Sequence, residues 1–277
     1  MEAPIVTLTS DWGTHDYYAA CVKGKLCSLM PQVKIHDLSH EQSWNDMATL
    51  MLMVRMGCLS FPEGTIHIID VGSEPLKRDM ASQGDGHQHF VPEPILAQYR
   101  GHFLICSELR PLSWALEQIP DQVVRLAVPS GLGSYSFLAH DLFCDIACRL
   151  AAGESPAQLG TPIDDFKLVR SPMPPIDTDV INVVVTAIDK YGNALLNLRY
   201  DDFERARSGR RFTAELGNRI GTDMVRTLST HYNDVRMGNL LLIVSKSGYL
   251  QLAVNGGSAF QLLGLRPTSP CRIRFYD

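Results

Sequence analysis

Apolar and polar residues alternate in blocks along the first 170 residues. A run of β-branched and apolar residues at 5–9 predicts a strand buried on both faces. Further strands are predicted at 33–39, 65–71, 102–107 and 123–128, and helical patterns begin near Tyr17 and cover 42–57, 112–119 and 138–152. Asp16 is expected to cap the first helix. Strands and helices that alternate at this spacing predict an α/β domain with a mostly parallel central sheet.

The pattern changes after the Pro-rich segment Ser171-Pro-Met-Pro-Pro-Ile-Asp177. Such a segment is typical of a domain boundary. Beyond it, strands are predicted at 180–188, 194–198 and 271–276, and residues 240–254 form a predicted hairpin with its turn near 246–248. We therefore predict an α/β N-terminal domain (1–170), a Pro-rich linker (171–179) and a smaller, β-rich C-terminal domain (180–277).

Composition and charge exclude several classes of function. The net charge of −5 and the absence of a Lys/Arg cluster argue against a nucleic-acid partner. The longest apolar runs have the length of strands, too short to cross a bilayer, and no leader peptide is evident. Seven scattered cysteines favour reduced thiols in a cytoplasm over a disulfide framework. Cys144 and Cys148 have no second ligand pair at zinc-like spacing, so no metal site is expected.

Three polar turns interrupt apolar strands: Ser10-Asp-Trp-Gly13, Asp189-Lys-Tyr-Gly-Asn193 and Val254-Asn-Gly-Gly257. A carboxylate can accept both hydroxyls of a ribose, and a purine can be held by amide hydrogen bonds and an aromatic ring. Asp11 stands at the carboxyl end of a predicted central strand, where open α/β sheets bind ligands. These turns thus suggest a nucleoside-like ligand, although turn conformation alone also explains Asp, Asn and Gly there.

Several motifs resemble those of one family. Ser10-Asp-Trp-Gly-Thr-His-Asp-Tyr-Tyr-Ala-Ala-Cys-Val-Lys-Gly24 is similar to the Asp-Phe-Gly…Asp-Pro-Tyr…Lys-Gly signature of the S-adenosyl-L-methionine (SAM) hydroxide adenosyltransferase and fluorinase/chlorinase family. The resemblance continues in the same order over nearly the whole chain, through residues 35–40, 61–65, 136–143, 187–193 and 247–257.

The resemblance implies a β-barrel-like C-terminal domain and a homotrimer that binds SAM between the N- and C-terminal domains of neighbouring subunits. SAM would be the substrate or ligand, with no separate cofactor. Asp11 would hold the ribose hydroxyls, and Trp44 is a possible substitute for a family aromatic residue that the ungapped count places at Asn45. The full set of implied binding residues is Asp11, Trp12, Trp44, Phe137, Asp189, Tyr191, Asn193, Ser247, Val254 and Gly256.

The implied reaction is attack of a nucleophile on the ribose C5′, with methionine as the leaving group. The protein would align the nucleophile with the sulfonium and remove its water shell. In the hydrolases of the family, an Asp, an Arg and a His orient and deprotonate the attacking water. The candidates here are Asp70 and Arg78, which match the family positions loosely, and the nearby His140, with His67 as a further candidate.

The sequence departs from the family in this water-activating set. No proline follows Asp70, which arrives two residues early, and Leu138 occupies the position of the family histidine. Cys106-Ser-Glu-Leu-Arg110 replaces the Pro-Asp-Asn-Gly motif, and Ala139 replaces the halide-binding serine. We therefore rank three functions. Hydrolysis of SAM to adenosine and L-methionine comes first, non-catalytic binding of SAM or adenosine second, and SAM-dependent halogenation third.

Overall fold

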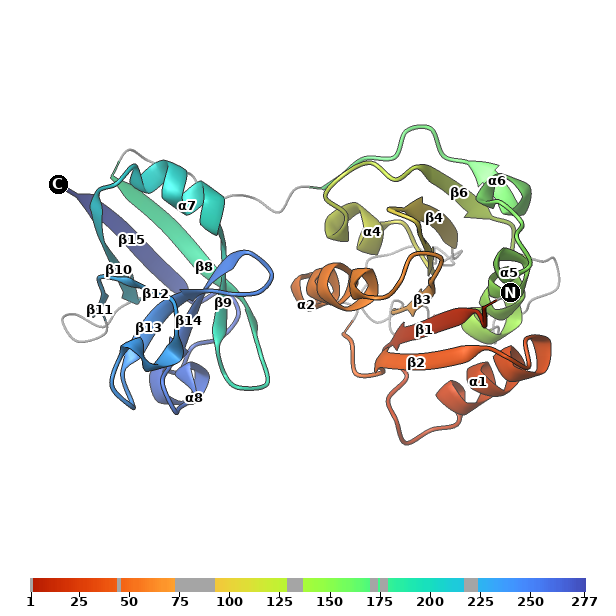
Figure 1. Ribbon diagram of the computed structural model, residues 1–277, viewed down its shortest axis with the longest axis horizontal. Coiled ribbons are helices and arrows are strands. Elements are labelled where there is room, and N and C mark those ends of the chain that lie inside the picture. Colours follow the sequence, from red (N-terminus) through yellow and green to blue (C-terminus); the bar gives the residue numbers. More distant parts are fainter. Residues whose placement is uncertain are drawn as a thin grey trace, which may run out of the picture. The chain divides into compact units, whose positions relative to one another are not determined.

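A computed structural model of the chain describes residues 2–43, 46–72, 93–128, 137–169, 174, 179–216 and 224–277. The chain divides into two units, 1–169 and 170–277, and each is described by itself (Figure 1). Most of the Pro-rich linker expected at 171–179 lies outside the described residues.

The described part of the first unit contains a mixed sheet of seven strands in the order β2-β1-β3-β5-β4-β6-β7. Strands β2, β1, β3 and β5 are parallel, whereas β4, β6 and β7 are antiparallel to their neighbours. The α/β class with a parallel core is thus confirmed. The bounds are β1 Ile5–Ser10, β2 Lys34–Ser39, β3 Ile66–Asp70, β4 Ile95–Tyr99, β5 His102–Cys106, β6 Gln122–Leu126 and β7 Gly160–Pro162.

The apolar run of β1 explains why this strand lies in the middle of the sheet. Residues 6–10 are all buried, so both faces of β1 are covered. On one face, Val6 and Leu8 join a core that also contains Val22 of α1 and Phe143, next to α5. Figure 1 shows α1 and α5 on one side of the sheet and α2 and α4 on the other.

The helices of the first unit differ from the predictions at their ends. Helix α1 begins at Tyr18, and Tyr17 occupies the N-cap position without making a side-chain capping hydrogen bond. The prediction that Asp16 caps this helix was therefore wrong. The helix predicted at 42–57 is shorter, because Asp46 caps α2 at its start and π-helical and 3-10 turns follow it. The bounds are α1 Tyr18–Leu29, α2 Met47–Leu52, α4 Arg110–Ala115, α5 Cys144–Ala151 and α6 Pro156–Leu159, with a π-helical turn over Ala139–Phe143.

The antiparallel half of the sheet includes a strand that the sequence did not predict. Strand β4 pairs with β5 through a two-residue turn, Arg100 and Gly101, with φ values of 50° and 77°. Positive φ at both positions is the geometry of a tight hairpin that matches the twist of its strands. The sheet therefore changes from parallel to antiparallel at β5.

The described part of the second unit forms an eight-stranded sheet in the order β11-β10-β15-β8-β9-β14-β13-β12. Contacts between β11 and β13 bring its two ends together, so the sheet is nearly closed and barrel-like, as expected. Phe203 and Phe212 are buried inside it. The bounds are β8 Val180–Ile188, β9 Ala194–Arg199, α7 Tyr200–Arg207, β10 Arg211–Leu216, β11 Met224–Val225, β12 Leu228–Ser229, β13 Leu240–Val244, β14 Tyr249–Val254, α8 Ala259–Leu263 and β15 Pro270–Tyr276.

All seven cysteines lie among the described residues, and all are free thiols. Burial raises the pKa of Cys58, Cys144 and Cys271 to about 12. Cys21 and Cys27 are exposed on α1. No helix in the described ranges combines the length and the apolar character that a bilayer crossing requires.

Candidate functional site

The carboxyl ends of β1 and β3 form the centre of the candidate site. Ser10 and Asp70 are register partners at these ends, and Asp11 follows β1 directly. The Asp11 carboxylate accepts a hydrogen bond from the Gly72 backbone N–H at 3.0 Å. Asp11 is half-buried, whereas Asp70 is fully buried. The two carboxylates therefore lie at adjacent strand ends in different environments.

Trp12 connects these two strand ends through its side chain. Its indole N–H donates a hydrogen bond to Asp70 Oδ2 at 3.2 Å. The indole stacks on the His40 ring, with centroids 5.5 Å apart and an interplanar angle of 19°. Phe137 meets it edge to face at 5.0 Å. The indole is therefore held on two sides while its N–H points to a buried carboxylate.

His40 follows β2 and supports the turn after β1 in two ways. Its backbone carbonyl accepts a hydrogen bond from the Gly13 N–H at 2.7 Å, and its Nδ1 lies 2.6 Å from Ser10 Oγ. Asp37 Oδ1 lies 3.1 Å from the other ring nitrogen. His40 was not among the predicted site residues, because only the tertiary structure brings its ring against Trp12.

His140 approaches this group of residues through Phe137. The two rings are nearly parallel, with centroids 6.5 Å apart. His140 Nδ1 lies 2.8 Å from Asp141 Oδ1, and Asp141 Oδ2 accepts the Phe137 N–H at 2.9 Å. Leu138, which the resemblance aligned with a histidine of the hydrolases, is buried. Trp44 and Arg78 lie outside the described residues.

His67 lies on the other face of β3 from Asp70, because side chains alternate along a strand and the two residues are three positions apart. Its Nδ1 is 2.7 Å from Thr7 Oγ1, and its Nε2 is 3.1 Å from His102 Nδ1. Burial, with the neighbouring His102, lowers the pKa of His67 to about 3. A neutral histidine in this place serves the packing of the sheet, and it is not among the residues around Asp70.

The predicted turn of the second unit is organised around Asp189. Asp189 Oδ1 accepts the backbone N–H groups of Tyr191 and Asn193 at 2.9 and 2.8 Å. Asp189 Oδ2 accepts the Asn193 side-chain amide at 2.8 Å and that of Gln251 at 3.2 Å. Gly192 has a φ of 81°, and a Cβ there would collide with Ser258. Asp189 thus fixes the turn, and Asn193 is displayed by it.

A pocket of about 520 Å³ lies beside this turn. The Asn193 amide also donates to the Tyr232 hydroxyl at 3.3 Å, and burial together with the Asp189 charge raises the pKa of Tyr232. The sequence contained no signal for Tyr232, since it is brought here from a separate 3-10 turn. The lining residues are Tyr191, Asn193, Tyr232, Val254, Gly256 and Gly257.

Ser247 lies away from this pocket. It belongs to the turn between β13 and β14, and its hydroxyl is 2.7 Å from that of Ser245. Val254 is at the other end of β14, on the order of 20 Å away at the usual rise of a strand. The described structure of the second unit therefore brings Asn193, Tyr191, Val254 and Gly256 together, and leaves Ser247 apart.

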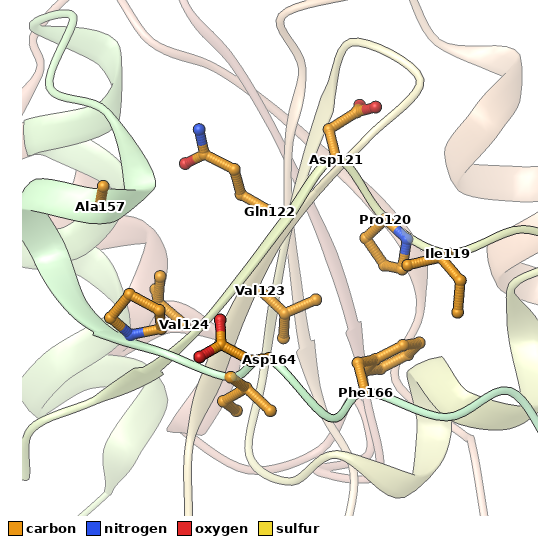
Figure 2. Close-up of a pocket in the computed structure, with 11 residues that line it drawn as sticks. Ile119, Pro120, Asp121, Gln122, Val123, Val124, Ala157, Asp164 and Phe166 are labelled. Carbon is orange, nitrogen blue, oxygen red and sulfur yellow. The ribbon is translucent and has the colours of Figure 1, made fainter.

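A second pocket, of about 240 Å³, lies over β6 in the first unit (Figure 2). Figure 2 shows Phe166 and Val123 at its wall, with Asp121 and Asp164 on either side. None of the predicted site residues lines this pocket. Within the described ranges, no three His, Cys, Asp or Glu side chains are grouped so that they can hold a metal ion.

Comparison with known proteins identifies the family of both domains. Residues 6–160 match the SAM hydroxide adenosyltransferase N-terminal domain, and residues 183–272 match the corresponding C-terminal domain. The chain is 26% identical to an (R)-S-adenosyl-L-methionine hydrolase of Salinispora tropica over 98% of this chain and 97% of that protein. It is 25% identical to a fluorinase of an Actinoplanes species, over 91% of each.

The fold is also found in a solved structure, that of an uncharacterised conserved protein from Thermotoga maritima. The TM-score is 0.74 at 19% identity, and the alignment covers 98% of this chain and 99% of the other. Both domain matches, in the expected order, cover most of the sequence. The chain belongs to the SAM hydroxide adenosyltransferase family.

Proposed function

We propose that this protein hydrolyses SAM to adenosine and L-methionine. The observation that carries this proposal is the pair of carboxylates, Asp11 and Asp70, at adjacent strand ends and joined through Trp12 and Gly72. Similarity to (R)-SAM hydrolases adds a finer proposal, that the R epimer at the sulfonium is the preferred substrate.

The two carboxylates would have separate roles. Half-buried Asp11 accepts the ribose hydroxyls, while its other contact, the Gly72 N–H, keeps it in place. Buried Asp70 orients and deprotonates a water molecule. The water oxygen forms a bond to C5′, the C5′–sulfur bond breaks, and its electron pair leaves with methionine. Shielding of the water from bulk solvent favours this displacement.

The remaining proposed residues would bind or orient the substrate. Phe137 and Trp12 offer apolar ring surface in the first unit. Asn193, Tyr191, Val254 and Gly256 line the pocket of the second unit, where backbone groups and an amide can bind a purine or an amino acid. Asp189 acts by holding the turn. Ser247, His140, Trp44 and Arg78 stay predictions of the family resemblance, as does the cytoplasmic location.

A second function, SAM or adenosine binding without turnover, is favoured by one observation. Leu138 is buried at the position of the family histidine, and the nearby His140 is hydrogen-bonded to Asp141. Halogenation ranks third, because Ala139 offers no hydroxyl to a halide.

The test is incubation with SAM that contains both sulfonium epimers, followed by chromatography. We expect equimolar adenosine and methionine, faster loss of the R epimer, and a rate lower by about 100-fold or more in Asp70→Asn with SAM affinity little changed. The exposed Asp165→Asn serves as the control for loss of one charge. Thermal stabilisation by SAM without adenosine would support the binder instead. A 5′-chloro product in chloride would support halogenation, and no response of any kind would overturn all three.

A further inference from the structure

We propose that Trp12 is a positioning residue, which fixes the Asp70 carboxylate through its indole N–H. The inference deepens the proposed function and rests on it for the catalytic consequence, but the structural part stands on geometry alone. It starts from a single contact, the 3.2 Å hydrogen bond from Nε1 to Asp70 Oδ2.

The contact is specific to tryptophan. The family signature that this stretch resembles has phenylalanine after the aspartate, and a phenyl ring has no N–H to donate. Asp70 is fully buried, and a buried carboxylate needs donors, since bulk solvent does not reach it. A hydrogen bond to an ionised acceptor is stronger than one between neutral groups. The indole N–H therefore stabilises the charged form of Asp70 and restricts its rotation.

The indole is itself held in place. His40 stacks on one side of the ring, and the edge contact with Phe137 limits movement on another. His40 is tied to the same turn by its contacts with Ser10 and Gly13. Because the indole is already fixed, its hydrogen bond to the carboxylate involves little further loss of conformational entropy. It can therefore orient a carboxylate better than a flexible side chain can.

Other ionisable groups surround this contact. Asp11 lies on the same turn as Trp12. Cys106 of β5 is the register partner of Ile69, and burial, with the charges of neighbours that include Glu108 and Asp70, raises the pKa of its thiol. His40, beside Asp37, is behind the indole. His140, beside Asp141, is behind Phe137. Among these groups, Asp70 is the one that accepts the hydrogen bond of the indole N–H.

The test that does not need activity follows the indole N–H signals by NMR in protein labelled with ¹⁵N-tryptophan. Each of the three tryptophans contributes one signal, and Trp12→Phe and Trp114→Phe assign two of them. We expect the Trp12 signal to be shifted downfield, protected from solvent exchange, moved by Asp70→Asn, and to follow one acid titration that Asp70→Asn removes. A Trp12 signal that ignores Asp70→Asn overturns the proposal, whatever the activity of the protein.

The kinetic test compares Trp12→Phe with Trp114→Phe, a matched loss of an indole in α4. If Trp12 orients Asp70, kcat falls by about 10- to 100-fold in Trp12→Phe while KM changes by less than about threefold. The acid limb of the pH profile moves upward, because the charged form of Asp70 has lost a donor. An unchanged kcat and pH profile overturns the positioning role. Absence of activity in the parent protein contradicts the hydrolase proposal only, and leaves the NMR result decisive for Trp12.

Discussion

Two aspartates at neighbouring strand ends have different surroundings and, we propose, different tasks. Asp11 is half-buried, and its carboxylate accepts a hydrogen bond from the Gly72 backbone N–H. Asp70 is fully buried under the indole of Trp12. A partly exposed carboxylate is suited to accept hydroxyls from a ligand, and a shielded one is suited to act on a single water.

Asp11→Asn is expected to weaken the binding of adenosine and SAM by about 10- to 100-fold, because an amide cannot accept both ribose hydroxyls. Isothermal titration calorimetry measures this, with Asp165→Asn as the control. A 2′-deoxy analogue of adenosine should lose affinity in the parent protein and be nearly unaffected by Asp11→Asn. Equal affinities in the variant and the parent would remove Asp11 from the ribose site.

Residue patterns alone predicted where Asp11 lies but not what surrounds it. The apolar run before it identified a buried strand, and the polar residues after it identified the strand end. The contact between Trp12 and Asp70 spans 58 positions. It depends on the register of β1 with β3 and on side-chain rotation, and neither of these is encoded in a local pattern.

Among the elements, β1, β3 and β5 carry a row of polar side chains on the face away from Val6 and Leu8. His67 of β3 is hydrogen-bonded to Thr7 of β1 on one side and to His102 of β5 on the other. Burial lowers the pKa of both histidines, that of His67 to about 3. A proton on His67 would therefore oppose folding.

The pH dependence of stability follows from the pKa of His67 in the folded and in the unfolded chain. The pKa of His67 is about 3 in the folded chain and 6.5 in its unperturbed form. Between pH 3 and pH 6.5 the unfolded chain binds a proton at His67 and the folded chain does not. The free energy of unfolding is therefore unaffected by this residue above pH 6.5 and falls as the pH drops below that value. The expected loss from this residue is about 1.4 kcal/mol per pH unit.

Urea unfolding at pH 7.5 and pH 4.5 measures this effect. His67→Gln keeps hydrogen-bonding groups but cannot titrate, so it should lower stability at pH 7.5 and flatten the fall toward pH 4.5. His231→Gln, which changes an exposed histidine, should follow the parent protein at both pH values. Parallel curves for His67→Gln and the parent would contradict the assignment.

The elements also mark the limit of pattern-based prediction. Alternating strands and helices correctly indicated the parallel core, β2-β1-β3-β5. Strand β4 follows a long polar stretch in the sequence, and no helix separates it from β5. An alternation of strands and helices therefore does not predict it. Strand β6 was predicted, but its antiparallel pairing was not, because it pairs with β4, which the pattern did not predict.

For the whole molecule, the family resemblance predicts a homotrimer. The second unit carries exposed apolar side chains around its pocket: Tyr191, with 79% of its surface exposed, Met237, with 81%, and Leu262, with 57%. Met237 and Leu262 lie next to Gly256 and Gly257 of that pocket. Apolar surface of this kind is often covered by self-association.

Sedimentation equilibrium should give three times the chain mass of 30.8 kDa. Met237→Glu should lower this mass by introducing a charge into the apolar surface, whereas Ile119→Glu, at an exposed apolar position in the first unit, should leave it unchanged. A mass of one chain for the parent protein at micromolar concentration would refute the trimer.

The hairpin of β4 and β5 also bears on the order in which the sheet assembles in time. Its strands are joined by two residues and can meet within roughly 1–10 μs, the usual time for a hairpin to form. Strands β1 and β3 must close a loop of sixty positions, from Val6 to Ile66. Non-local pairs form more slowly because loop closure costs entropy before contacts repay it. The hairpin is therefore expected to form before β1 and β3 pair, so the two strand ends that carry Asp11 and Asp70 come together after it.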